Sequence, residues 1–155
     1  MEFLFNVEGL LMPDSDGFAI VDGSNPPGFM RNRQIGINAH RTSSFFENQG
    51  NGQNASPAMQ LEEIIDKMGT ASAKAQKLPS IITSSMKFFN TDNKIFFRVV
   101  GNQVIGFIKM GKRNLFYRGV GGQIKEIKPL CVLDFYVHES VQRGGHGKAL
   151  FEIML

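Results

Sequence analysis

A glycine-containing loop in residues 142–147 is the clearest candidate for binding an anion. It reads Gln-Arg-Gly-Gly-His-Gly and follows an apolar, partly β-branched run, residues 130–137. Residues 148–155 then place apolar side chains at helical spacing, so a strand, a tight turn and a helix are predicted. Free backbone N–H groups and the positive end of a helix dipole meet at such a turn, and glycine lets a phosphate approach closely.

Nucleotide-binding templates narrow the choice of anion. A GxxxxGK[ST] loop requires Gly at 142 and Ser or Thr at 149, where this chain has Gln142 and Ala149. A GxGxxG fingerprint from Gly145 requires Gly at 150, where the chain has leucine. The pattern [Q/R]-x-x-G-x-[G/A] does fit, as Gln142, Gly145 and Gly147. It resembles the pyrophosphate loop of the GCN5-related N-acetyltransferases, which bind acetyl-coenzyme A.

A longer stretch narrows the resemblance further. Residues 131–155, CVLDFYVHESVQRGGHGKALFEIML, resemble the core motif of the α-tubulin N-acetyltransferases. Residues 1–5, 69–78 and 105–111 resemble the same family in the same order. The resemblance implies an α/β (α+β) class, as a partial GCN5-related acetyltransferase fold. Its sheet is expected to be mixed and mostly antiparallel with flanking helices, and its C-terminal strands to be missing beyond residue 155.

The resemblance also implies a function, namely acetylation of a lysine on the luminal loop of α-tubulin in microtubules. Acetyl-CoA is the implied cosubstrate, with no metal, and Gln76 and Cys131 are the implied catalytic residues. Backbone N–H groups splayed by a bulge around residues 135–137 are expected to stabilise the oxyanion. The implied coenzyme-binding residues are Phe135, Tyr136, Val137, His138, Glu139, Ser140, Val141, Gln142, Arg143, Gly144, Gly145, His146, Gly147 and Lys148.

Several of these residues also have a simpler structural interpretation. Without the resemblance, Gln76 is a solvated residue near a helix end, and a lone cysteine in an apolar strand is usually buried and inert. His146 is interpreted as a loop residue whose backbone faces the phosphates, and Lys148 as a residue near enough to reach one. His138 and His146 have no third ligand beside them, which argues against a metal site.

The family pattern is incomplete in this sequence. The catalytic aspartate and the second coenzyme-binding segment of the family are expected beyond residue 155. Neither Asp134, inside a strand, nor Asp92, in a turn, is expected to replace that aspartate. An alternative is therefore a truncated, catalytically inactive remnant that binds tubulin or microtubules. A third hypothesis is an acetyltransferase for another amine.

Composition constrains partners and location. The 155 residues fit a single domain, and Lys+Arg 17 against Asp+Glu 14 gives a net charge of +3, which suits an anionic cosubstrate or acidic partner. The absence of a dense run of basic residues with interleaved aromatics argues against a nucleic-acid partner.

Residues 1–12 contain two glutamates and no basic residue before the apolar stretch, which argues against a signal peptide or membrane span. The single cysteine agrees with a reducing compartment. The expected location is the cytoplasm on cytoskeletal microtubules, with the ciliary axoneme as one candidate.

Periodicity and breaker residues predict the remaining elements. We expect a first strand over residues 2–11, then a mobile Gly/Asn/Ser-rich insertion at 22–54. Ser56 and Pro57 predict a helix start, with Leu61, Ile64, Ile65, Met68 and Ala75 on one face and Pro79 as its stop.

Strands are predicted over residues 94–100, 103–109 and 114–118, with Phe96, Val104, Ile108 and Leu115 in the core. The basic side chains on and beside them form either a solvated face or a contact surface for acidic tubulin. They are Lys109, Lys112, Arg113 and Arg118.

Overall fold

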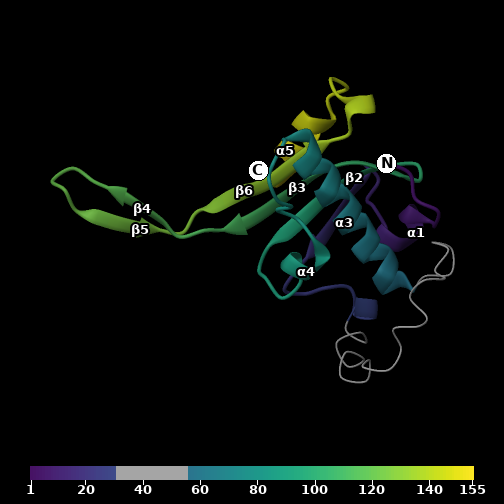
Figure 1. Cartoon of the computed structure of the whole chain (residues 1–155), viewed down its shortest axis with the longest axis horizontal. Helices are drawn as coiled ribbons and strands as arrows, with labels where there is room; N and C mark the ends of the chain where they lie inside the picture. The colour runs from purple at the N-terminus through teal and green to yellow at the C-terminus, as the bar shows by residue number, and fades with distance from the viewer. Residues whose placement is uncertain (31–55) are drawn as a thin grey trace.

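An antiparallel sheet forms the centre of the chain in the computed structural model, which describes residues 1–30 and 56–155. Within these residues the sheet has four strands in the order β1-β2-β3-β6. Their bounds are Phe18–Asp22 for β1, Lys94–Val100 for β2, Gln103–Lys112 for β3 and Leu130–Val137 for β6 (Figure 1). An antiparallel sheet with flanking helices confirms the predicted class, and β6 has the predicted bounds.

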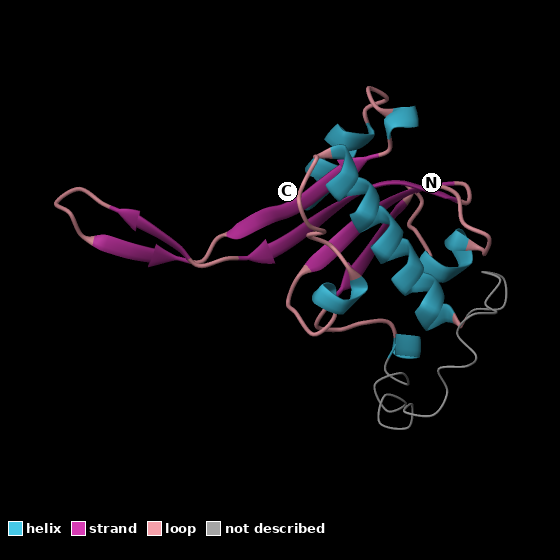
Figure 2. Cartoon of the chain, viewed as in Figure 1, coloured by secondary structure: helices cyan, strands magenta, loops and turns pink. Residues whose placement is uncertain are grey.

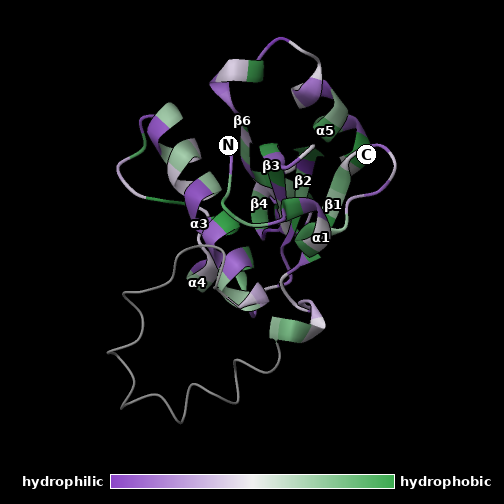
Figure 3. Cartoon of the chain, turned by 90° about the vertical axis from the view of Figure 1, so that its right-hand side faces the viewer, coloured by the Kyte–Doolittle hydropathy of each residue, from purple (hydrophilic) through white to green (hydrophobic). Residues whose placement is uncertain are grey.

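Helix α3 (Pro57–Ala75) crosses one face of the sheet (Figure 2). It begins as predicted, because the Ser56 side chain accepts a hydrogen bond from the Met59 N–H and Pro57 needs no partner at the first position. Hydrophilic and hydrophobic residues alternate along it (Figure 3). Its apolar stripe, with Leu61, Ile64 and Ile65 fully buried, packs against the sheet. Ala75 is exposed, so its predicted place on that stripe was wrong.

Helix α5 (His146–Met154) lies on the other face, where Leu150 is buried against Ile108 and Val137. Successive side chains of a strand point to opposite faces of the sheet, so a single strand packs against both helices. In β2, Ile95, Phe97 and Val99 are buried toward α3, whereas Phe96 is only partly buried and packs with the α5 cluster. The end of β6 therefore lies between two helices.

Strands β4 (Leu115–Arg118) and β5 (Ile124–Ile127) form a separate antiparallel hairpin that projects away from the sheet (Figure 1). All eight of its strand residues are exposed. Leu115, a predicted core residue, is 46% exposed, because the hairpin extends past the body of the sheet and has no second layer over it among the described residues. That prediction was wrong.

The N-terminal segment corrects the predicted first strand. Glu2 makes only an isolated bridge to Gln103, and residues Val7–Leu11 form helix α1. The Asn6 side chain accepts a hydrogen bond from the Gly9 N–H and so starts the helix. The alternating burial of residues 3, 5 and 7 explains why this segment reads as a strand.

The predicted mobile insertion falls mostly outside the described residues. Its first part, residues 22–30, is described: the Gly23 N–H donates to the Asn93 carbonyl, and Met30 is buried. Residues 31–54 of that prediction lie outside the part of the chain that the structure describes. Strand β1, which precedes them, and helix α4 (Ser85–Phe88) were not predicted.

Candidate functional site

A cavity of about 390 Å³ lies where the end of α3, the end of β6 and the start of α5 meet. Helix α3 contributes Ala75 and Gln76 to its wall. The other lining residues all belong to the strand-turn-helix segment: Phe135, Tyr136, Val137, Gln142, Arg143 and Gly147. The structure thus places Gln76 in one cavity with much of the predicted coenzyme segment.

The turn between β6 and α5 is held in an unusual backbone conformation. A short 3₁₀ helix, Glu139–Val141, follows the strand, and the Gln142 side chain donates to the Val137 carbonyl at 3.0 Å. Arg143 and Gly145 have φ of 70° and 82°, in the left-handed region. Glycine adopts that region without strain, whereas arginine does so at a cost of the order of 1 kcal/mol.

The first turn of α5 presents free donors beside this cavity. Gly145 is its N-cap residue, and no side chain of the described residues caps it. The helix begins at His146, so the prediction that His146 is a loop residue was wrong, although its backbone N–H is among the free donors of the first turn. A Cβ on Gly147 would lie 3.2 Å from Phe135 Cζ, a tight contact that would require this ring to shift by a few tenths of an ångström. This arrangement fits a phosphate group.

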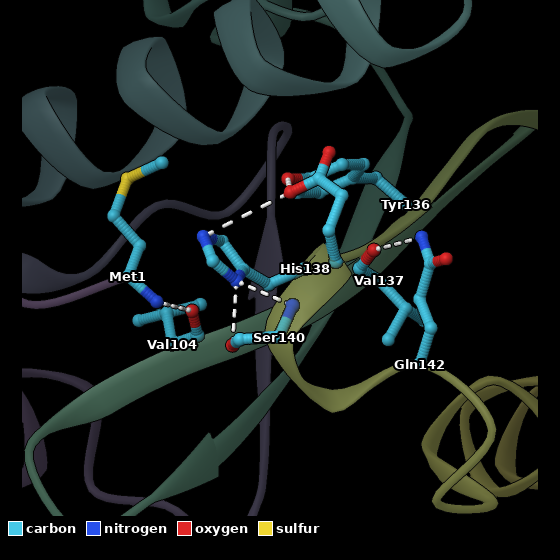
Figure 4. A network of polar contacts seen from close by, with 8 residues as sticks. Met1, Val104, Tyr136, Val137, His138, Ser140 and Gln142 are labelled. Carbon is cyan, nitrogen blue, oxygen red and sulfur yellow. Dashed lines mark hydrogen bonds and ion pairs between the residues drawn. The ribbon is translucent and has the colours of Figure 1, made fainter.

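A polar cluster links the end of β6 to the turn (Figure 4). The Tyr136 hydroxyl donates to Glu139 at 2.9 Å, and His138 Nδ1 accepts from the Ser140 N–H at 3.2 Å. Burial and the bond to Glu139 raise the pKa of the Tyr136 hydroxyl. Hydrogen bonds from its own backbone and from Tyr136 lower the pKa of the exposed Glu139. The cluster therefore holds the turn with a protonated Tyr136 and an ionised Glu139.

Asp134 lies at the centre of a buried network beneath the cavity and is 5% exposed. Its Oδ1 accepts from Ser72 Oγ at 2.8 Å, from Gln76 Nε2 at 3.1 Å and from the Phe135 N–H at 2.9 Å. Its Oδ2 accepts from Thr83 Oγ1 at 2.6 Å. The network ties α3 and the loop before α4 to β6.

Comparison with known proteins identifies the family. Residues 30–155 match the family described as GNAT acetyltransferase, Mec-17. The chain belongs to this family. It is 53% identical over 96 residues to the α-tubulin N-acetyltransferase of Tetrahymena thermophila, covering 62% of this chain and 24% of the relative. It is 43% identical over 117 residues to that of Schistosoma japonicum, covering 68% and 44%.

A third relative, the α-tubulin N-acetyltransferase of Aedes aegypti, is 38% identical over 129 residues, covering 81% of this chain and 47% of the relative. The chain thus spans less than half the length of each of these curated relatives. Its match to the Mec-17 family includes all of the cavity described above.

Some predicted site residues of this Mec-17 family member lie outside the cavity. Cys131 is partly buried, with its Sγ 3.5 Å from the Pro129 carbonyl, and is not among the cavity-lining residues. Lys148 is exposed, and its Nζ lies 3.8 Å from Glu152 Oε1. The remaining predicted coenzyme residues outside the lining are His138, Glu139, Ser140, Val141, Gly144, Gly145 and His146. Their roles stay predictions.

The bulge in β6 is displaced from its predicted position. Lys109 pairs with Asp134 and Met110 with Val132, so Leu133 is the extra residue, rather than one of residues 135–137. The bulge immediately precedes Asp134, whose carboxylate accepts a hydrogen bond from the Phe135 N–H. That N–H is therefore already used within the strand, which removes Phe135 from the predicted oxyanion donors, and the role of residues 136 and 137 stays a prediction.

The buried network around Asp134 was missed by the sequence reasoning. The available signal was a carboxylate inside an apolar strand, since a buried charge requires partners. Its partners Ser72 and Thr83 carry no such signal, because each is an ordinary small polar residue in sequence.

Among residues 1–30 and 56–155 no group of three His, Cys, Asp or Glu side chains is placed to hold a metal ion. None of the helices in these ranges has the length and apolar character that a bilayer span requires.

Lys109 departs from its predicted place in an exposed basic group. It is 4% exposed, and its Nζ donates to the Ile82 carbonyl at 3.2 Å. Burial lowers the pKa of its ammonium group, and the nearby Asp134 charge offsets part of that effect. Lys112, Arg113 and Arg118 remain exposed.

Replacing Lys109 by methionine should change how stability depends on pH. Between the lowered folded pKa of Lys109 and its ordinary value of about 10.4, the unfolded chain binds more protons than the folded one, so stability rises with pH, by at most about 1.4 kcal/mol per pH unit. Lys109→Met should lack this part of the rise. Urea unfolding at several pH values below 10 measures the slope. Lys112→Met, at an exposed site, is the control, and equal slopes for Lys109→Met and wild type would contradict the assignment.

Proposed function

We propose that this chain takes part in the acetyl-CoA-dependent acetylation of a lysine side chain on the luminal loop of α-tubulin in microtubules. The observation that most supports this is the shared cavity, lined by Gln76 from α3 and by Gly147 at the uncapped start of α5. The names of the Tetrahymena, Schistosoma and Aedes relatives suggest the acceptor.

The coenzyme diphosphate is assigned to the turn between β6 and α5, with residues 135–148 as the binding segment. The free N–H groups of the first turn of α5 supply donors, and Arg143 adds positive charge at the cavity wall. Acetyl-CoA supplies a thioester, whose C–S bond breaks as the amine nitrogen forms the amide, with the amine proton passing to a base and CoA leaving as the thiol.

The acceptor lysine must reach the cavity as a neutral amine, although a free lysine has a pKa near 10.4. Gln76 is the cavity residue assigned to the amine. Cys131 is proposed either to take the proton or to order the groups that do. A test of the cysteine is Cys131→Ala in a tubulin acetylation assay, where unchanged rates would remove it from the site.

Tubulin would be recognised away from the cavity, by exposed positive charge. Lys112, Arg113 and Arg118 lie at the base of the β4–β5 hairpin and on it, and they would orient an acidic partner and speed its association. The expected location is then on cytoplasmic microtubules, with the ciliary axoneme as one candidate site.

Replacing Gly147 by valine should weaken binding of acetyl-CoA by at least about tenfold. The new side chain would meet Phe135 Cζ and occupy the wall at the start of α5, where the phosphate is assigned. Isothermal titration calorimetry with acetyl-CoA and CoA measures the change. Gly119→Val is the matched control, since a Cβ at Gly119 has only the Gln123 carbonyl oxygen at 3.8 Å nearby.

The same titration tests the proposed function. Binding of acetyl-CoA by wild type, followed by transfer to microtubules, is the expected result. If neither this chain nor a longer chain that continues as the relatives do gives heat with acetyl-CoA or CoA, the proposal is wrong.

A second candidate is binding to tubulin or microtubules without acetyl transfer. The projecting hairpin favours it, because its exposed apolar residues, such as Phe116 and Ile124, and its basic residues lie on an element separate from the cavity. Microtubule co-sedimentation without acetyl transfer would support this second function over the first.

A further inference from the structure

The side-chain amide of Gln76 is held by two neighbours at the end of α3. Its Nε2 donates to Ser72 Oγ at 2.8 Å and to Asp134 Oδ1 at 3.1 Å. Ser72 is fully buried and Asp134 nearly so, whereas Gln76 is exposed at the cavity wall. The two buried residues therefore act on Gln76 from beneath the cavity.

The chemistry of these groups permits only one orientation of the amide. An ionised carboxylate has no proton to donate, so the Gln76 atom beside Asp134 Oδ1 must be the nitrogen. Ser72 uses its single hydroxyl proton on the same Oδ1, so its oxygen can only accept from Gln76. The amide nitrogen therefore faces both oxygen atoms, and Oε1 makes no hydrogen bond within the described residues.

We infer that Asp134 and Ser72 are positioning residues that direct the amide oxygen of Gln76 toward the cavity as a hydrogen-bond acceptor. This inference rests on the proposed function for its consequence: the oxygen accepts an N–H of the acceptor amine and orients its lone pair toward the thioester. A neutral carbonyl suits this task, since a carboxylate there would stabilise the ammonium form of the amine, which cannot attack.

The orientation can be tested without any activity measurement. In wild type the Nε2 amide of Gln76 should exchange its bonded hydrogen with solvent more slowly than an exposed glutamine does, measured by NMR of the side-chain amide. Ser72→Ala should speed the exchange of Gln76 and leave the fold intact. Exchange in wild type at the rate of a free glutamine amide would overturn the inference.

Kinetics on tubulin test the consequence. Ser72→Ala and Asp134→Leu are expected to lower kcat by about tenfold to hundredfold, the value of one or two hydrogen bonds to a charged group, with the Kd for acetyl-CoA unchanged. Asp134→Asn should rescue kcat to within about threefold of wild type, because the asparagine oxygen can still accept at the Oδ1 position while the Thr83 hydroxyl turns to accept from its NH₂.

A control residue outside the cavity lining distinguishes a general loss of stability from a specific effect on Gln76. Asn102→Ala removes the bonds of Asn102 to the Val7 N–H and the Phe5 carbonyl, so it should lower stability without changing Gln76 exchange or kcat. If Ser72→Ala leaves kcat unchanged, or if Asp134→Asn loses as much as Asp134→Leu, the positioning role is wrong. If wild type transfers no acetyl group, the proposed function is wrong, while the exchange rates still decide the orientation.

Discussion

Replacing Asp134 by alanine is expected to lower the free energy of unfolding by about 3–5 kcal/mol, the range for removing one partner of a buried charged network. The change leaves the buried hydroxyls of Ser72 and Thr83 without their acceptor. It also leaves the buried ammonium group of Lys109 without its nearest opposite charge. Unsatisfied buried groups of this kind cost more than the bonds themselves contribute.

Urea unfolding at neutral pH, followed by circular dichroism, measures this loss. Asp92→Ala is the control, because Asp92 is exposed in the turn before β2 and its removal should change stability by no more than about 0.5 kcal/mol. A loss below about 1 kcal/mol for Asp134→Ala would mean that water reaches the network and replaces the carboxylate.

Elements with local causes could be predicted from the sequence. The start of α3 depends on Ser56 and Pro57 themselves, so neighbouring residues suffice to place it. Strand β6 is a continuous apolar run, and the turn after it is marked by glycines. The cavity-lining residues of this segment were therefore predicted together, because they are consecutive in sequence.

Elements determined by distant contacts could not be placed in this way. Residues 3, 5 and 7 alternate as in a strand, but Asn102 at the β2–β3 turn, 95 residues away in sequence, accepts the Val7 N–H where helix α1 begins. Leu115 was predicted as a core residue because it is an apolar residue in a strand-like run, whereas its exposure follows from how far the hairpin projects. Both outcomes depend on tertiary placement rather than on local propensity.

The same distinction explains the site. Gln76 was predicted from a resemblance, and sequence alone reads it as a solvated residue. Its environment is set by Asp134, which comes from a strand distant in sequence, and by the bulge at Leu133 beside it. A charged residue in an apolar strand indicates that partners exist, but only the packing of α3 on the sheet shows which residues they are.

Replacing Gly69 by alanine is expected to lower the free energy of unfolding by about 2–3 kcal/mol, although alanine is the better helix former by about 1 kcal/mol. Gly69 is buried in the middle of α3, at the point where the loop before α4 touches the helix. A Cβ there would overlap the carbonyl oxygen of Thr83 and lie 2.7 Å from its carbonyl carbon. Because the obstacle is backbone, the loop as a whole must move away from the helix.

Thermal and urea unfolding measure this change, with Thr70→Ala as the matched control. Thr70 is the next residue of α3 and is exposed, so its replacement adds helix propensity without the clash and should leave stability within about 0.5 kcal/mol of wild type or above it. Equal stability of Gly69→Ala and Thr70→Ala would mean that the loop moves away from the helix without a cost in free energy.

A double-mutant cycle connects this glycine to the buried network. Displacement of Thr83 by Gly69→Ala also pulls its hydroxyl from Asp134 Oδ2, so part of the loss in each single variant is the same hydrogen bond. The combined loss in Gly69→Ala with Asp134→Ala should therefore fall short of the sum by about 1 kcal/mol. Strict additivity would mean that the loop moves without carrying Thr83 from the carboxylate. The close approach of the loop at Gly69 is then required for the hydrogen bond from Thr83 to Asp134. Because Asp134 in turn accepts from Gln76, the same approach also supports the position of the Gln76 amide.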